Sequence, residues 1–196
     1  MKRSLAAAVL ILLGLASSAP AAVVWRTGLG IGPQHINDPK IRSTYGQQAV
    51  FRPSVEAAFG RHLSAGLAYE FGYRRDGRIG IDLLPTSLSM SGINLALGYE
   101  IPIGSAALYG RAGYGLYFYK QTIDGSFLGG HEVDRSQSTI VAGMGVRIRA
   151  GRSFFLSGEA EVVPLKVRPY DVTVDLGGFR LFFGAGFVLN PPAGAR

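Results

Sequence analysis

The residues that could perform nucleophilic chemistry are few in this sequence. The histidines are His35, His62 and His131. A serine nucleophile needs a histidine base that a carboxylate orients, and His131 lies beside Glu132 and near Ser136 and Ser138. On one face of a strand the histidine and the serine would stand two residues apart, but the residue two positions after His131 is Val133, and His62-Leu63-Ser64, which has this spacing, begins in the predicted turn 60–62. We therefore assign no catalytic residue and interpret His131 as part of a loop surface.

Cofactor and metal chemistry find equally little support. The chain has no cysteine, so thiolate metal sites and disulfides are both excluded. Glu132 and Asp134 are only two carboxylates, too few to predict a cation site. The segment Gly28-Leu29-Gly30-Ile31-Gly32 resembles a phosphate-binding loop, but no helix follows it. We expect no bound cofactor and no metal.

Arginine and glutamate at alternating positions are the remaining candidates for a site. The residues concerned are Arg52, Glu56, Glu70, Arg111, Arg147, Glu159 and Arg180. Residues of these types can pair as ions in a structural network, provided that the segments carrying them bring them to one interior. Whether these residues form such a network therefore depends on the secondary structure of the segments that carry them.

The stretch 178–189 shows what kind of segment this is. One alternating set, Phe179 to Leu189, has no polar member, and the other set is small with one charge, Arg180. A strand places the two sets on opposite faces. A soluble sandwich would turn polar residues to water, and glycine is a poor choice there. A transmembrane barrel explains both faces, because lipid takes the apolar set and a narrow lumen takes the small set.

Eight segments alternate in this way, which predicts an all-β, eight-stranded antiparallel up-and-down transmembrane β-barrel. They cover residues 22–31, 48–59, 63–74, 86–101, 106–121, 137–150, 153–167 and 178–189. The connections alternate between long loops, such as 32–47, 122–136 and 168–177, and short turns, such as 60–62 and 151–152. Residues 75–78 read as a turn and 79–84 as an extension of the wall. We expect bulges at Pro53 and at Ser91-Gly92, where the apolar phase changes.

The predicted inward face collects the charges and the predicted lipid face excludes them. Besides the seven residues above, the inward set holds Arg26, Glu100, Arg149 and Glu161. A Lys or Arg on the lipid face near the midplane would cost about 2–4 kcal/mol. In the expected register Arg52 faces Glu70, and Glu159 lies diagonal to Arg147. Paired charges in so narrow an interior would make a plug rather than a pore.

The N-terminus reads as a signal peptide over residues 1–22. A basic start with Lys2 and Arg3 precedes an apolar run over 5–15 and the small segment Ala19-Pro20-Ala21. The apolar run is shorter than the roughly 20 residues of a transmembrane helix. Removal of the signal peptide would lower the net charge of the chain from +7 to +5, because residues 1–22 contain two basic residues and no acidic one. For an exported chain, anionic lipid and lipopolysaccharide are better partners for this charge than nucleic acid.

These features together resemble the small outer-membrane barrels of the OmpA/OmpX type, the outer-membrane β-barrel domain family. The ending Gly184-x-x-Phe187-x-Leu189 is similar to the C-terminal strand signal that such barrels present to the barrel-assembly machinery, although residues 191–196 follow it. The resemblance implies a monomeric barrel over residues 23–190 in a Gram-negative outer membrane, with a short periplasmic tail at 191–196. It does not imply one function.

Three function classes remain open. The favoured one is a non-enzymatic envelope protein with a structural or surface-interaction role and a lumen plugged by Arg and Glu. The alternative is a narrow channel for small or hydrophobic solutes, which a lumen dominated by Gly, Ala and Ser would favour. The third is a lipid A-modifying enzyme, which the lack of a serine two residues from His131 disfavours.

Overall fold

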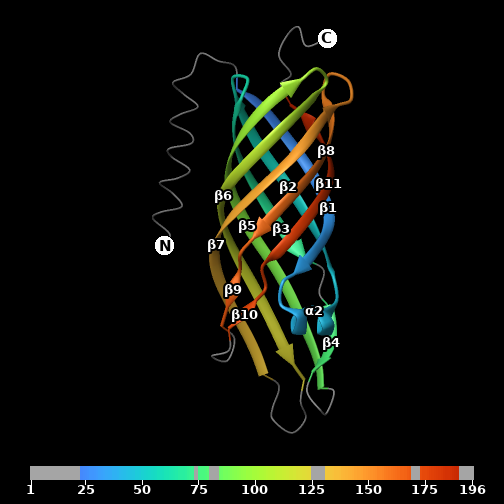
Figure 1. The fold of residues 1–196 in the computed structure, drawn as a ribbon, viewed down its shortest axis with the longest axis vertical. Coiled ribbons are helices and arrows are strands. Elements are labelled where there is room, and N and C mark those ends of the chain that lie inside the picture. Colours follow the sequence, from blue (N-terminus) through green and yellow to red (C-terminus); the bar gives the residue numbers. More distant parts are fainter. Residues whose placement is uncertain (1–22, 73–74, 80–83, 125–130, 169–172, 190–196) are drawn as a thin grey trace.

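Eight strands form a closed antiparallel barrel, as predicted (Figure 1). The computed structural model describes residues 23–72, 75–79, 84–124, 131–168 and 173–189. The barrel strands are β1 (Val24–Ile36), β2 (Gln48–Phe59), β3 (Leu63–Gly72), β5 (Leu84–Ile103), β6 (Ala106–Ile123), β7 (His131–Arg149), β8 (Phe154–Val163) and β11 (Gly178–Val188). Each strand pairs with its neighbour along the chain, and β1 pairs with β11 to close the ring.

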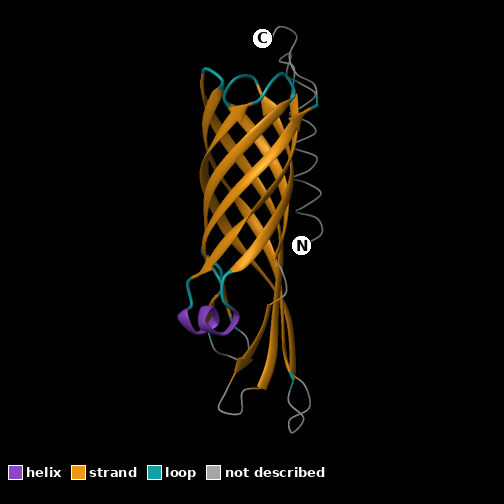
Figure 2. Cartoon of the chain, turned by 90° about the vertical axis from the view of Figure 1, so that its right-hand side faces the viewer, coloured by secondary structure: helices purple, strands orange, loops and turns teal. Residues whose placement is uncertain are grey.

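The two ends of the barrel differ, and we name them by their connections. At the turn end, β1 begins, β11 ends, and short turns follow β2, β5 and β7. Gly60, Gly104 and Gly151 occupy these turns with positive φ, a conformation that glycine adopts at little cost. At the loop end lie the longer connections and all the smaller elements (Figure 2). Among the described residues, no helix is long and apolar enough to cross a membrane.

At the loop end, four strands (β1, β5, β6 and β7) extend further than the sequence predicted, whereas β8 ends at Val163, before the predicted residue 167. β6 continues to Ile123 and β7 begins at His131, so much of the predicted loop 122–136 is paired strand. The predicted turn at 75–78 is wrong, because β4 (Arg75–Ile79) pairs with the start of β5. Both segments are polar on both faces, so they lack the alternation that marked the other strands. Residues 80–83, within the predicted extension of the wall, lie outside the described part.

A short helix and a two-stranded sheet stand over the barrel at the loop end. The helix α2 (Pro39–Tyr45) lies within the predicted loop 32–47, and its N-cap Asp38 accepts hydrogen bonds from the amides of Lys40 and Ile41. The strands β9 (Lys166–Val167) and β10 (Val174–Asp175) pair with each other. Backbone bonds from Asn37 to Gly177 (2.9 Å) and from Asp38 to Asp175 (3.2 Å) tie the first and last loops together.

Both predicted bulges are wrong. The β5–β6 register is continuous through Ser91 and Gly92. The β2–β3 register is the same on either side of Pro53, with Phe51 opposite Phe71 and Ser54 opposite Ala68. The apolar residues of β5 change from the outward to the inward face because the side chains that fill the barrel change from charged to apolar, whereas the backbone pairing stays regular.

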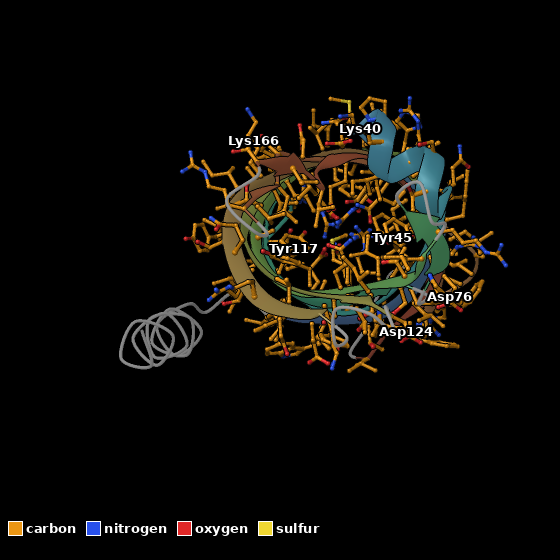
Figure 3. The ribbon with its side chains drawn as sticks, turned by 90° about the horizontal axis from the view of Figure 1, so that it is seen from below. Lys40, Tyr45, Asp76, Tyr117, Asp124 and Lys166 are labelled. Atoms are coloured by element: carbon orange, nitrogen blue, oxygen red, sulfur yellow. The ribbon has the colours of Figure 1, made fainter. Side chains whose placement is uncertain are left out.

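An apolar cap explains this change of phase. Towards the loop end the inward side chains become apolar, and Leu88 and Met90 pack there with Tyr45 of α2 and Val167 of β9. Seen from the loop end, side chains fill the ring, with Tyr45 and Tyr117 inside it (Figure 3). The barrel interior is therefore charged in its middle and apolar at one end.

Candidate functional site

The inward faces of the strands bring ten charged residues into one lumen. They are Arg26, Arg52, Arg111, Arg147 and Arg180 together with Glu56, Glu70, Glu100, Glu159 and Glu161. Five positive charges face five negative ones, so this set is neutral as a whole. It divides into two clusters along the barrel axis, and each of them is neutral by itself.

The turn-side cluster consists of Arg26, Glu56, Glu100 and Arg147. Arg26 Nη1 lies 2.7 Å from Glu56 Oε1 and 2.7 Å from Glu100 Oε1. Arg147 Nη2 lies 3.1 Å from Glu56 Oε2, and Arg147 also pairs with Glu100. These side chains come from β1, β2, β5 and β7, so the pairs cross the lumen as well as linking neighbouring strands.

The central cluster is more deeply buried and contains Arg52, Glu70, Arg111, Glu159, Glu161 and Arg180. Glu161, whose side chain is fully buried, lies at its middle. Its carboxylate is 3.2 Å from Arg52, 2.6 Å from Arg111 and 3.5 Å from Arg180. Three arginines surround this one carboxylate, which offsets much of the cost of removing it from water.

The other two carboxylates complete the central cluster. Glu159 accepts from Arg52 at 2.8 Å, from Arg111 at 2.6 Å and from the hydroxyl of Tyr109 at 2.9 Å. Glu70 pairs with Arg180 and accepts from the Tyr117 hydroxyl at 3.1 Å. The tyrosines thus contribute neutral donors from β6, and they fix the carboxylates without adding charge.

Aromatic rings support the arginines from the wall. The Arg52 guanidinium lies 3.7 Å from the ring centre of Phe182, and that of Arg147 lies 5.0 Å from Phe155. Inward glycines of β1 and β11 leave room for these rings. A Cβ added to Gly186 would approach the Phe155 ring to 2.4 Å, closer than packed atoms allow. The glycine-rich inward face seen in the sequence therefore makes space for the aromatic support.

A small cavity of about 60 Å³ lies among the charges. Arg26, Arg52, Arg111 and Arg147 line it, together with glycine backbone of β1. The buried Nε atoms of Arg111 and Arg147 have no protein partner. A volume of this size accommodates a few water molecules, which could satisfy such atoms.

The structure thus brings together all seven site residues that the sequence singled out, together with Arg26, Glu100 and Glu161 from the same inward set. Arg149 is the exception, because it is exposed at the turn end. The expected Arg52–Glu70 pair is loose, at 4.0 Å. In the register Arg147 and Glu159 are diagonal, but Arg147 pairs with Glu56 and Glu100 instead. The supporting Tyr109 and Tyr117 are not among the predicted site residues, because they carry no charge, although they alternate with Arg111 on the inward face of β6.

The other candidates for chemistry stand apart from this lumen. His35 accepts a hydrogen bond from Arg42 of α2 at 2.6 Å, and His62 bonds the Glu100 carbonyl at 2.8 Å. The side chain of His131 lies outside the described part. Glu132 pairs with Lys120 at 2.8 Å on the exposed face of β6 and β7. Within the described ranges, no three His, Asp or Glu side chains gather as a metal site would require.

The sequence matches the family model described as "Outer membrane protein beta-barrel domain" over residues 6–187. The chain belongs to this family. Its members reside in the outer membrane, and in such barrels the short turns face the periplasm, which places the turn end there and the loop end outside the cell. The predicted signal peptide at 1–22 and the tail at 191–196 lie outside the described residues.

Solved structures show the same fold at low sequence identity. Ail, the attachment invasion locus protein of Yersinia pestis, was crystallised with the heparin analogue sucrose octasulfate; it is 17% identical, with a TM-score of 0.58, and the match covers 85% of this chain and 99% of Ail. Outer membrane protein OprG of Pseudomonas aeruginosa is 10% identical, with a TM-score of 0.61 and coverage of 87% and 96%. Neisserial surface protein A is 13% identical, with a TM-score of 0.55 and coverage of 86% and 99%. No curated protein sequence matches the chain.

Proposed function

We propose that this protein is a non-enzymatic outer-membrane barrel whose lumen is plugged by the Arg/Glu clusters, with an envelope structural or surface-interaction role. The observation that carries the proposal is the balance of the lumen, where five arginines meet five glutamates in two neutral clusters. An ion that passed through would have to break several buried pairs and lose its own water. The apolar cap at the loop end adds a second barrier, because most of its buried side chains, such as Leu88, Met90 and Val167, offer an ion no polar partner.

The surface role rests on what the loop end presents. Helix α2 and the extended strands project at the loop end, away from the short turns (Figure 2), and β4, β9 and β10 lie at the same end. Of the proteins with the same fold, Ail is described as an attachment invasion locus protein and was crystallised with a heparin analogue. We propose a comparable contact with molecules outside the cell. We also propose that the protein is a monomer, contacts outer-membrane lipid and lipopolysaccharide, and is inserted by the barrel-assembly machinery.

Bilayer conductance tests the plug. The refolded wild-type protein should add no ion-conducting steps to a planar membrane. Replacing Arg147 with alanine should destabilise the barrel, because Glu56 and Glu100 would each lose an ion-pair partner. Arg78→Ala, which changes the same charge at an exposed position of β4, serves as the matched control. The plug is refuted if the wild type conducts ions and Arg147→Ala changes that conductance without destabilising the barrel.

A narrow channel is the second candidate, and the lumen cavity favours it. The cavity of about 60 Å³ lies beside small residues such as Gly30, Ser54 and Gly184. If this cavity widened into a continuous path through the lumen, small solutes would enter vesicles that contain the protein, and the vesicles would swell. A sealed lumen would leave the vesicles unchanged.

An enzymatic role in lipid A modification finds no support in the ten charged residues of the lumen, which pair with one another. Activity on lipid A, measured by mass spectrometry of lipid extracted from membranes that carry the protein, should equal that of membranes without it.

A further inference from the structure

The net positive charge of the protein is unevenly distributed along the barrel axis. The lumen contributes none, because its five arginines match its five glutamates. At the loop end, the described residues include eight basic and six acidic side chains, so the charge there is mixed. At the turn end, the described charged side chains are Arg61, Arg149 and Arg152, and none of the described turn residues is acidic. Anionic lipid and lipopolysaccharide are the partners expected for the basic excess, and the part of the excess without neighbouring acids faces the periplasm.

These three arginines stand where the lipid-facing surface ends. Arg149 follows Ile148, which is exposed on the outer face of β7, and Arg61 lies two residues before the exposed Leu63. Arg152 lies two residues before Phe154, which packs edge-on against Phe187 with ring centres 5.5 Å apart. Each arginine is itself exposed.

Aromatic side chains at the same level mark the membrane boundary. Trp25 and Tyr99 are exposed at the turn end, at 43% and 52%. Tryptophan and tyrosine favour the boundary between lipid and water, at the level of the head groups. The three guanidinium groups therefore stand at the depth of lipid phosphates, and a guanidinium forms paired, charge-assisted hydrogen bonds with phosphate.

We propose that the turn end is a binding surface for anionic phospholipid head groups of the periplasmic leaflet, with Arg61, Arg149 and Arg152 as the phosphate contacts. The surface has two parts around the ring. Arg61 lies in the turn between β2 and β3, whereas Arg149 and Arg152 flank the turn between β7 and β8. β1 lies between these parts, since the strand order runs β3, β2, β1, β11, β8, β7. The inference rests on the outer-membrane placement of the turn end and does not require the plug.

The single tryptophan is a natural probe of this lipid. Trp25 lies near the start of β1, the strand between β2 and β11, and its side chain is exposed, so it adjoins the lipid between the two parts of the surface. The protein is refolded into phosphatidylcholine vesicles that contain a minor fraction of brominated phosphatidylglycerol or, in parallel, of brominated phosphatidylcholine. Bromine quenches tryptophan fluorescence only at short range, so the ratio of the two quenching signals measures the lipid preference beside Trp25.

The wild type should prefer the anionic lipid by about fivefold per contacting arginine at low salt, which corresponds to about 1 kcal/mol for each basic residue. The preference should shrink as the salt concentration rises. The variant R61Q/R149Q/R152Q should show nearly equal quenching by the two lipids. The control R78Q/K166Q/R168Q removes the same charge from the loop end and should keep the wild-type preference. Boiled and unboiled gel lanes verify that each variant is folded.

Several outcomes would overturn the proposal. Equal quenching by both lipids in the wild type at low salt would do so, as would a preference that the turn-end variant retains or the loop-end control loses. If the wild type shows no lipid preference but sediments with peptidoglycan through the same three arginines, the partner is the cell wall. Conductance is measured separately, so a leaking lumen would count against the plug and leave this result standing.

Discussion

Replacing Arg180 with methionine should destabilise the barrel by about 3–5 kcal/mol, the usual cost of removing one partner from a buried ion pair. The Arg180 side chain is 1% exposed and that of its partner Glu70 is 2% exposed, so water screens the pair little. At an effective dielectric constant of about 20, two charges about 4 Å apart interact by about 4 kcal/mol. Methionine retains much of the volume, so the dominant loss is the compensation of charge on Glu70 and Glu161.

The residual contacts of Glu70 show why the loss is large. Without Arg180, its nearest cation is Arg52 at 4.0 Å, and its other contact is the Tyr117 hydroxyl at 3.1 Å. The central cluster would carry one uncompensated negative charge. The double variant R180M/E70Q removes that charge again and should recover at least half of the lost stability.

The assay is urea unfolding of protein refolded into lipid vesicles, followed by Trp25 fluorescence and by the fraction that migrates fast without boiling. Arg78→Met is the control, because Arg78 is exposed on β4 and such surface changes stay within about 0.5 kcal/mol. The reasoning fails if R180M unfolds within about 1 kcal/mol of the wild type. It also fails if R180M/E70Q is no more stable than R180M, since the cost would then not arise from unpaired charge.

Three further changes test other parts of the fold. Gly186→Val should lower the yield of the heat-modifiable band and cost about 1–3 kcal/mol, because its Cβ alone would lie 2.3 Å from the Thr27 carbonyl oxygen and 2.4 Å from the Phe155 ring, whereas Gly186→Ala, which adds only that Cβ, should cost less. Tyr45→Phe removes hydrogen bonds to Thr86 at 2.7 Å and Gln121 at 2.9 Å; amide exchange in α2 should quicken by about fivefold to tenfold, for about 1 kcal/mol, with the barrel strands unchanged. Met144→Lys, at a lipid-facing position exposed at 70%, should cost about 2–4 kcal/mol in urea unfolding, and equal stability of the two proteins would argue against lipid contact there.

The sequence was sufficient to predict the strands that border lipid. β2 was predicted at Gln48–Phe59 and lies there, because an apolar outer face penalises any slip of register by one residue. The same constraint is absent beyond the membrane, where β4 and the start of β7 are polar on both faces. Helix α2 had a usable local signal, since Asp38-Pro39 is an N-cap followed by a proline in the first turn.

Pairing within the lumen could be predicted only in part. Alternation places a residue inside, and the hairpin register gives its neighbours on adjacent strands, such as Glu70 opposite Arg52. The hairpin register gives no distance between strands that face each other across the lumen. The pair of Glu100 on β5 and Arg26 on β1 is of this kind. The circumference, the tilt of the strands and the bulk of rings such as Phe182 decide those contacts.

The partners in the lumen indicate when the clusters form during folding. Arg26 and Glu100 are 74 residues apart, and Arg180 and Glu70 are 110 residues apart. Arg180 belongs to β11, the last strand, which meets β1 only when the ring closes. Contacts of such long sequence separation reward the chain only after the entropy of closure has been overcome. We therefore expect the central cluster to stabilise the closed barrel over any open sheet of the same strands, and R180M to speed unfolding more than it slows the pairing of β2 with β3.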